Sequence, residues 1–240
     1  MLVQSPNTLL QELTFSKGSE SVSYIHKFGA NPNLVSGSQT IWSGEGLYPW
    51  SAFDNIQTLY LISTDSGDTG TIELQGLDAD FLPITETVTM TGLTAKATQN
   101  QFKRIFRMVY TGPAGAPNLG TITARTVSGT GTVVSHMVEG TAQTLMAVYT
   151  VPANYQAYGA QYTVGIGKGG DAEFQVVTRS NSPTGSFRIR GNLELYQTTF
   201  TQTYKVPVLL PPKTDIDFRA VTTGNNFPAT ANFDLLLTKV

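Results

Sequence analysis

The sequence predicts an all-β protein made of two tandem antiparallel β-sandwiches of the jelly-roll type. Three observations lead to this prediction. Apolar and polar residues alternate with a period of two over much of the chain. Turn residues separate these runs at intervals of roughly 8–12 residues, the spacing of a sandwich or barrel. The polar positions are mostly Thr, Ser, Gln and Asn, and only 13 % of residues are charged.

The alternating runs occur in both halves of the chain. Each places its apolar residues on one face of an extended segment, because side chains two apart on a strand share a face. Examples are Ile84–Met90, Phe102–Tyr110, Phe174–Thr178, Ile216–Ala220 and Phe233–Leu237. The segments between them carry turn signals such as Ser66–Gly70, Pro113–Pro117, Asn181–Gly185 and Gly224–Asn226.

A small polar stretch near the midpoint, Arg125–Thr132, suggests where the chain divides. We expect an N-terminal arm or short helix over residues 1–14, a first sandwich over 15–126, a linker over 127–139 and a second sandwich over 140–240. A length of 240 residues suffices for two sandwiches of ordinary size. The alternative is one larger sandwich in which the polar stretch is a loop.

Charge and composition exclude several classes of function. A net charge of −2 with scattered basic residues provides no stripe for a nucleic-acid backbone. The chain has no cysteine, and therefore no disulfide framework or thiolate metal site. No apolar run approaches the roughly 18 residues of a membrane span, and the N-terminus lacks the features of a secretory signal. We therefore expect synthesis in the cytoplasm and no nucleic-acid or membrane partner.

Motifs for catalysis or cofactor binding are weak. The glycine-rich run Gly165–Gly170 is followed by a strand rather than a helix, so we interpret it as a hairpin turn and not a phosphate loop. His26 and His136, the two histidines, are far apart in the sequence, and metal sites usually need clustered ligands. Asp65 and Asp68 lie in a loop with too few carboxylates for calcium. We expect no metal, no cofactor and no enzymatic activity.

Two pairs of carboxylates have the spacing that places both on one face of a strand. Asp78 and Asp80 occur in a turn, where Asp is common because it bonds to the backbone. Asp215 and Asp217 alternate with Ile216 and Phe218, so we expect them on the solvated face of an amphipathic strand. Neither pair predicts an acid–base site.

The best candidate for binding is an aromatic segment. Trp42, Tyr48 and Trp50 fall within a run rich in glycine and proline, Ile41–Trp50. Aromatic rings on an irregular segment can stack on sugars or on a protein partner. The alternative is that they close one end of the first sandwich.

Five strings along the chain carry a family resemblance. They are HKFGANPN (26–33), IWSGEGLYPW (41–50), IELQGLDADFLPITETVTMTG (72–92), FKRIFRMVYTG (102–112) and QTLMAVYTVPA (143–153). In these strings the chain resembles a family of virion structural proteins from tailed phages of marine bacteria, including cyanophages. The resemblance covers about residues 24–153 and continues weakly to the C-terminus. It implies a particle protein without catalytic residues, located in the virion after assembly in the host cytoplasm.

Within that resemblance we expect a capsid decoration or cement protein that binds the major capsid protein or other virion proteins. Leu9, Leu10 and Leu13 would anchor an N-terminal arm to the shell. Exposed sheet edges favour symmetric assembly, so we expect a homo-oligomer, with a trimer preferred. Two alternatives remain open: a tail adaptor or fibre-associated protein, and a carbohydrate-binding module that uses the aromatic segment in host adsorption.

Overall fold

The computed structural model describes residues 22–180, 185–224 and 226–240, and this part of the chain is almost entirely antiparallel strand. It contains no α-helix within those ranges, only two short 3-10 turns, at Trp50–Phe53 and Pro113–Gly115. None of its helices could span a membrane. The predicted all-β class is thereby confirmed. The predicted arm over residues 1–14, with Leu9, Leu10 and Leu13, lies outside the described residues.

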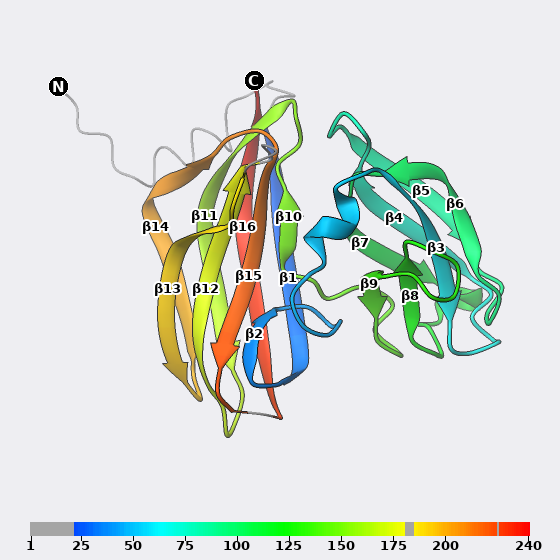
Figure 1. Ribbon diagram of the computed structural model, residues 1–240, viewed down its shortest axis with the longest axis horizontal. Coiled ribbons are helices and arrows are strands. Elements are labelled where there is room, and N and C mark those ends of the chain that lie inside the picture. Colours follow the sequence, from blue (N-terminus) through cyan, green and yellow to red (C-terminus); the bar gives the residue numbers. More distant parts are fainter. Residues whose placement is uncertain (1–21, 181–184, 225) are drawn as a thin grey trace.

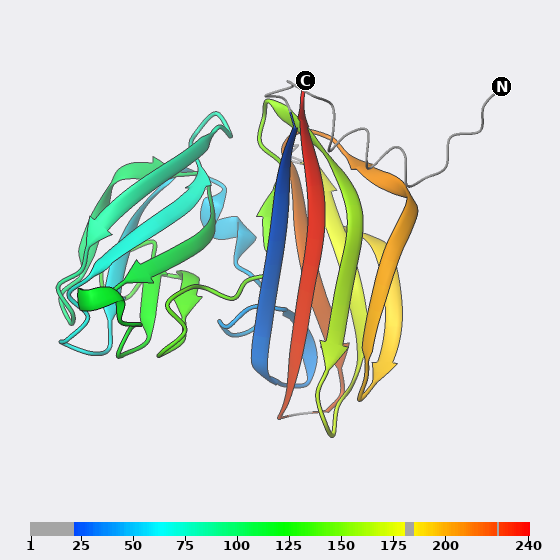
Figure 2. The ribbon, with the colours of Figure 1, turned by 180° about the vertical axis from the view of Figure 1, so that it is seen from behind.

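The larger sandwich is a jelly roll (Figures 1 and 2). One sheet, seen from behind in Figure 2, has the order β1 (Val22–Leu34), β16 (Phe227–Lys239), β11 (Tyr155–Ile166), β14 (Thr199–Leu210). The facing sheet has β2 (Gly37–Thr40) and β10 (Val148–Thr150) end to end along β15 (Thr214–Thr222), followed by β12 (Asp171–Ser180) and β13 (Arg188–Tyr196).

Strand order identifies this fold. The short strands β2 and β10 pair with consecutive parts of β15, so together they fill one strand position. The nine strands then occupy eight positions, with the order 1-8-3-6 in one sheet and 2-7-4-5 in the other. This is the eight-stranded arrangement of two Greek keys that defines a jelly roll.

The smaller sandwich consists of the seven strands between β2 and β10. One sheet has the order β6 (Lys96–Phe102), β3 (Gln57–Ser63), β8 (Ile122–Arg125), β9 (Val133–Met137). The other has the order β5 (Pro83–Thr89), β4 (Thr71–Leu77), β7 (Arg104–Thr111). Leu59, Leu74 and Met108 are among the fully buried residues of its core. We call this unit the insert, because it interrupts the second strand of the jelly roll.

The structure divides the chain differently from the sequence-based boundaries. Residues 22–40, assigned to the first sandwich, belong to the jelly roll, where β1 pairs with β16. Residues 133–137, assigned to the linker, form β9 of the insert. The sandwiches are therefore nested and not consecutive. Alternation shows which segments are strands but not which strands pair, and here the first strand pairs with the last.

A short two-stranded stalk connects the insert to the jelly roll. The amide of Ile41 donates to the carbonyl of Phe218 at 2.8 Å, and the amide of Ala147 donates to the carbonyl of Ile41 at 2.9 Å. Trp42 then bridges Met146 in antiparallel fashion. Gly29 of β1 lies against this stalk so closely that a Cβ would be 2.2 Å from the oxygen of Ile41. No larger residue fits there without backbone movement.

Candidate functional site at the junction of the two sandwiches

The insert and the jelly roll meet along a junction whose centre is a buried carboxylate, Asp215 of β15. Arg104 of β7 binds it in bidentate fashion, with Nε and Nη2 each 3.0 Å from a carboxylate oxygen. Arg179 of β12 donates at 2.7 Å and the hydroxyl of Thr150 at 2.6 Å. Bidentate Arg–carboxylate pairs are strong and directional, so Arg104 fixes the insert in one orientation on β15.

A second buried carboxylate, Asp217, lies two residues further along the same strand. It accepts hydrogen bonds from the indole of Trp50 at 3.0 Å, from Thr40 at 2.9 Å and from Arg219 at 2.8 Å. Burial raises the pKa of this carboxyl, while the Arg219 guanidinium and these hydrogen bonds act in the opposite direction. The insert thus contributes Trp50 to one carboxylate and Arg104 to the other.

The expectation that Asp215 and Asp217 face solvent was wrong. Both are fully buried, because the insert covers the face of β15 that is opposite to Ile216 and Phe218. A strand that carries apolar residues on one face and charged ones on the other usually lies at the surface. Here the charged face is an internal contact between two sandwiches.

The aromatic segment lies in the same region. Trp42, Tyr48 and Trp50 are each at most 6 % exposed and belong to the core of the insert. Tyr48 makes edge-to-face contacts with both tryptophans, at ring-centroid distances of 5.3 and 4.9 Å. Rings buried this deeply offer little surface on which a sugar could stack, and Trp50 instead orients Asp217.

A cleft of about 550 Å³ opens beside the junction. The jelly roll contributes the start of β1 together with Tyr149 and Tyr155, and the insert contributes parts of β4, β5 and β7. Phe106 of β7 packs on Tyr149 with a centroid distance of 4.5 Å and joins the core of the jelly roll. This contact closes the inner end of the cleft with apolar side chains from both sandwiches.

Two cations line this cleft, Lys27 of β1 and Arg107 of β7. Lys27 is 8 % exposed, and its ammonium donates to the carbonyl of Phe106 at 2.5 Å. Burial, followed by the charge of Arg107, lowers the pKa of Lys27 to about 7. Arg107 donates to Gln143 and lies 5.8 Å from the centroid of Phe28, but its buried Nε has no hydrogen-bond partner. The sequence analysis did not single out either residue.

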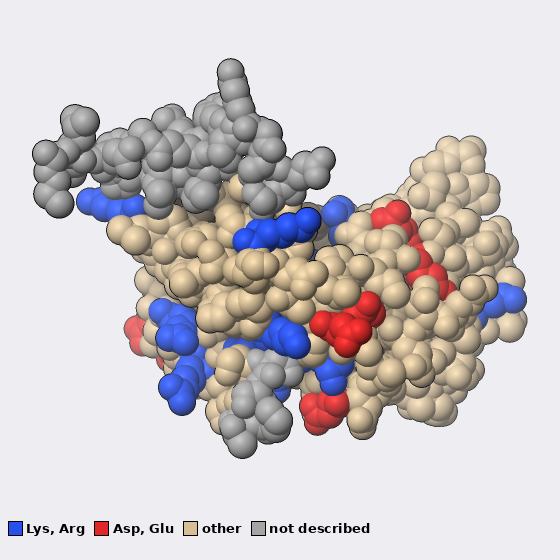
Figure 3. Space-filling model, turned by 90° about the horizontal axis from the view of Figure 1, so that it is seen from above, with Lys and Arg blue, Asp and Glu red and all other residues tan. Residues whose placement is uncertain are grey.

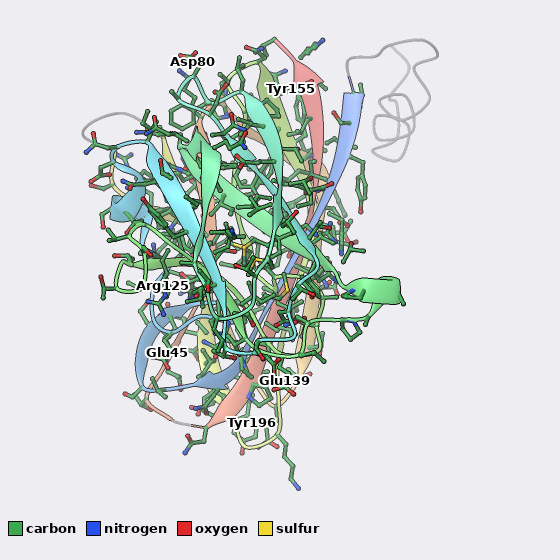
Figure 4. The ribbon with its side chains drawn as sticks, turned by 90° about the vertical axis from the view of Figure 1, so that its right-hand side faces the viewer. Glu45, Asp80, Arg125, Glu139, Tyr155 and Tyr196 are labelled. Atoms are coloured by element: carbon green, nitrogen blue, oxygen red, sulfur yellow. The ribbon has the colours of Figure 1, made fainter. Side chains whose placement is uncertain are left out.

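A second, larger groove of about 1040 Å³ also lies between the sandwiches, and Glu45, Arg125 and His136 are among its lining residues. Figure 4 shows Glu45 and Arg125 on the lower flank of the molecule, whereas Tyr155 of the cleft lies at the upper end. Burial lowers the pKa of His136, and its Nδ1 has no hydrogen-bond partner. Its lining mixes polar and apolar side chains and includes Asn31, Trp42 and Leu47.

The structure places the other polar candidates in structural roles. Asp68 is fully buried and accepts bonds from Ser63 and from the amides of Leu119 and Gly120, so its carboxylate holds two loops together. Asp78 accepts from the amides of Asp80 and Leu82 within its turn. No cluster of three potential metal ligands occurs among the described residues.

The remaining two candidates also have clear locations. His26 lies at the surface and bonds to Asp234 at 2.6 Å. The glycine-rich run forms the turn between β11 and β12, as expected, but these strands belong to different sheets. It is therefore a connection across the sandwich and not a hairpin.

The comparisons with known proteins add only distant likenesses. No protein-family model and no curated protein matches the chain. Among solved structures, infectious bursal disease virus, Gx strain, matches with 12 % identity over 96 % of this chain and 77 % of that chain, at a TM-score of 0.28. The T=1 particles derived from the same virus match with 11 % identity over 99 % and 80 % of the two chains, at a TM-score of 0.24. At these scores the jelly-roll assignment depends on strand order alone.

Proposed function

We propose that this chain is a non-enzymatic structural component of a phage particle and that it decorates the head shell. The observation that carries the proposal is the architecture: a jelly roll that presents a second β-sandwich inserted into its second strand. Jelly rolls occur in viral capsid proteins, as well as in lectin domains and cupins. The resemblance of residues 24–153 to virion proteins of marine phages favours the first of these classes.

The surface supports a role in an assembly that is exposed to the medium. Only 13 % of the chain is charged. On the end of the molecule shown in Figure 3, charged side chains form small separate groups on a largely uncharged surface.

On the side away from the insert, the sheets of the jelly roll end in β13 and β14, whose outer edges pair with no other strand of the described part of the chain (Figure 1). Large apolar side chains are exposed on these strands: Ile189, Tyr196, Val206 and Leu209. A long edge of this kind pairs readily with another chain unless it is covered. We propose that it contacts the shell or a second copy of the chain, which agrees with a homo-oligomer, of which a trimer is the preferred form.

Localisation on particles tests the proposal. We expect a cryo-electron microscopy reconstruction of purified heads to contain density of this shape in symmetric copies on the outer surface, and immunogold labelling to mark heads. Labelling of tails alone would contradict decoration and favour the tail-adaptor alternative. Absence from particles altogether would contradict the virion role.

A further inference from the structure

We infer that the cleft between the two sandwiches is a binding site for a carboxylate attached to an apolar body, with Lys27 and Arg107 as its anion-binding residues. This inference does not depend on the virion role. The cleft has a volume of about 550 Å³, within the range of roughly 300–1,000 Å³ that is typical of small-ligand sites.

The first argument is the missing counter-charge. No Asp or Glu occurs among the residues that line the cleft. Lys27 is more than nine-tenths buried, and none of the ion pairs found among the described residues includes it. Its ammonium has three donors, of which one bonds to the carbonyl of Phe106. A buried cation without a partner is unfavourable, and a bound anion would relieve that cost.

The second argument comes from the neighbouring arginines of the same junction. Arg104, Arg179 and Arg219 each pair with a carboxylate of this chain. At the centre of the junction, each of these cations is therefore matched by a carboxylate of the chain, whereas Lys27 and Arg107 have no carboxylate among the residues that line the cleft. Arg107 also has a buried Nε without a hydrogen-bond partner, so the hydrogen bonds of its guanidinium are incompletely satisfied.

The walls indicate the rest of the ligand. Phe28, Leu77, Phe106, Tyr149 and Leu237 are among the lining residues, together with the polar side chains of Gln75 and Thr144. A mostly apolar lining with a few polar groups fits an aromatic or branched aliphatic acid. The same chemistry is available from a free small acid or from an acidic side chain flanked by apolar residues in a partner protein.

Protonation of Lys27 would couple binding to pH. Its pKa of about 7 means that the amine is largely charged at pH 6 and largely neutral at pH 9. The other titratable groups at the cleft are Tyr24 and His26 on β1, Tyr149 on β10 and Tyr155 on β11, and Asp234 of β16 bonds to Tyr24 and His26. Of these groups and Arg107, only Arg107 exerts a charge effect on the pKa of Lys27.

The test is an NMR titration of the full chain with benzoate at pH 6, with benzyl alcohol and benzylamine as uncharged and cationic counterparts. A blocked tripeptide, acetyl-Phe-Asp-Phe-amide, represents an acidic side chain of a partner. We expect at least one acid to shift resonances around the cleft, with weaker binding at pH 9. Binding of benzoate would indicate a free acid as a sufficient ligand, and binding of the peptide alone would indicate a partner protein.

Two independent variants and one control complete the test. Lys27→Met and Arg107→Gln should each weaken binding by about tenfold, since each removes a charge-assisted hydrogen bond. Lys205→Gln removes a positive charge from exposed β14 and should leave affinity unchanged. The inference is overturned if neither acid binds up to about 10 mM, if benzyl alcohol binds as well as benzoate, or if both cleft variants bind like the unmodified chain.

Discussion

The two parts of the junction between the sandwiches differ in whether their cationic side chains have a carboxylate partner. Around Asp215 and Asp217, every buried guanidinium has a carboxylate of the same chain. In the adjoining cleft, Lys27 and Arg107 have none among the residues around them. The first arrangement holds the insert in place without any further molecule. In the inferred binding mode a bound carboxylate supplies the charge that the described residues of the cleft lack.

The largest expected change in the free energy of unfolding comes from breaking the ion pairs around Asp215. Asp215→Ala leaves Arg104 and Arg179 without their carboxylate in a buried environment. We expect a loss of about 3–5 kcal/mol in the free energy of unfolding, measured by urea denaturation. Asp171→Ala, at an exposed position of β12, is the control and should change stability by less than about 0.5 kcal/mol. A similar small loss for both variants would show that the network does not hold the junction together.

A substitution at Gly29, which lies against the stalk, should destabilise the protein almost as much. Gly29→Ala places a Cβ 2.2 Å from the carbonyl oxygen of Ile41 and 2.3 Å from the amide of Ala147, and both of these are backbone atoms. We expect a loss of about 2–3 kcal/mol by thermal or chemical denaturation. Gly159→Ala in β11, whose nearest neighbour would be at 3.7 Å, should be close to neutral. Equal effects of the two substitutions would contradict a close approach at the stalk.

In the cleft, removal of the positive charge of Lys27 should stabilise the ligand-free protein. The pKa of Lys27 is lower in the folded state than in the unfolded chain, so its burial cost is full below pH 7 and disappears as the pH rises towards 10.5. We expect Lys27→Met to gain on the order of 1–2 kcal/mol at pH 6 and progressively less above pH 7. Denaturation curves at several pH values measure this. A loss of stability at pH 6 would indicate that Lys27 already has a counter-charge.

The smallest effect on stability is expected far from the junction. Ile189→Lys and Val206→Lys introduce charge at the free edges of β13 and β14, where both side chains are more than half exposed. We expect changes within about 0.5 kcal/mol in unfolding free energy, but loss of any self-association seen by light scattering, because charged edges resist pairing. Unchanged association would place the contact between copies elsewhere.

Much of the architecture could be predicted from the sequence. Period-two alternation located the strand from Ile84 to Met90 within one residue at each end, and found the C-terminal part of β16 from Phe233 to Leu237, because local burial produces that pattern. The nesting could not be predicted in this way. The pairing of β1 with β16 joins segments about two hundred residues apart, and nothing in either segment indicates its partner.

The junction was harder to predict for a related physical reason. The charged face of β15 has the pattern of a solvated surface, and only the position of the insert makes it internal. The sequence around Lys27 contains a pattern that could have predicted its burial. Lys27 shares the inward face of β1 with Ile25 and lies opposite Phe233 of β16, and a lysine among such neighbours is unusual. The aromatic segment was predicted as a candidate binding site with packing as the alternative, and the structure buries its rings in the core of the insert, where Trp50 orients Asp217.

The stalk is a point at which the inserted domain could be exchanged for another. The chain leaves the jelly roll at Ile41 and returns at Ala147, where a single hydrogen bond of 2.9 Å joins the two points. A different domain could be grafted there while all eight strand positions of the host are kept. Any replacement would have to cover Asp215 and Asp217, with a cation in the place of Arg104 and a hydrogen-bond donor in the place of Trp50. Donor domains can be screened for these two groups before a chimera is made.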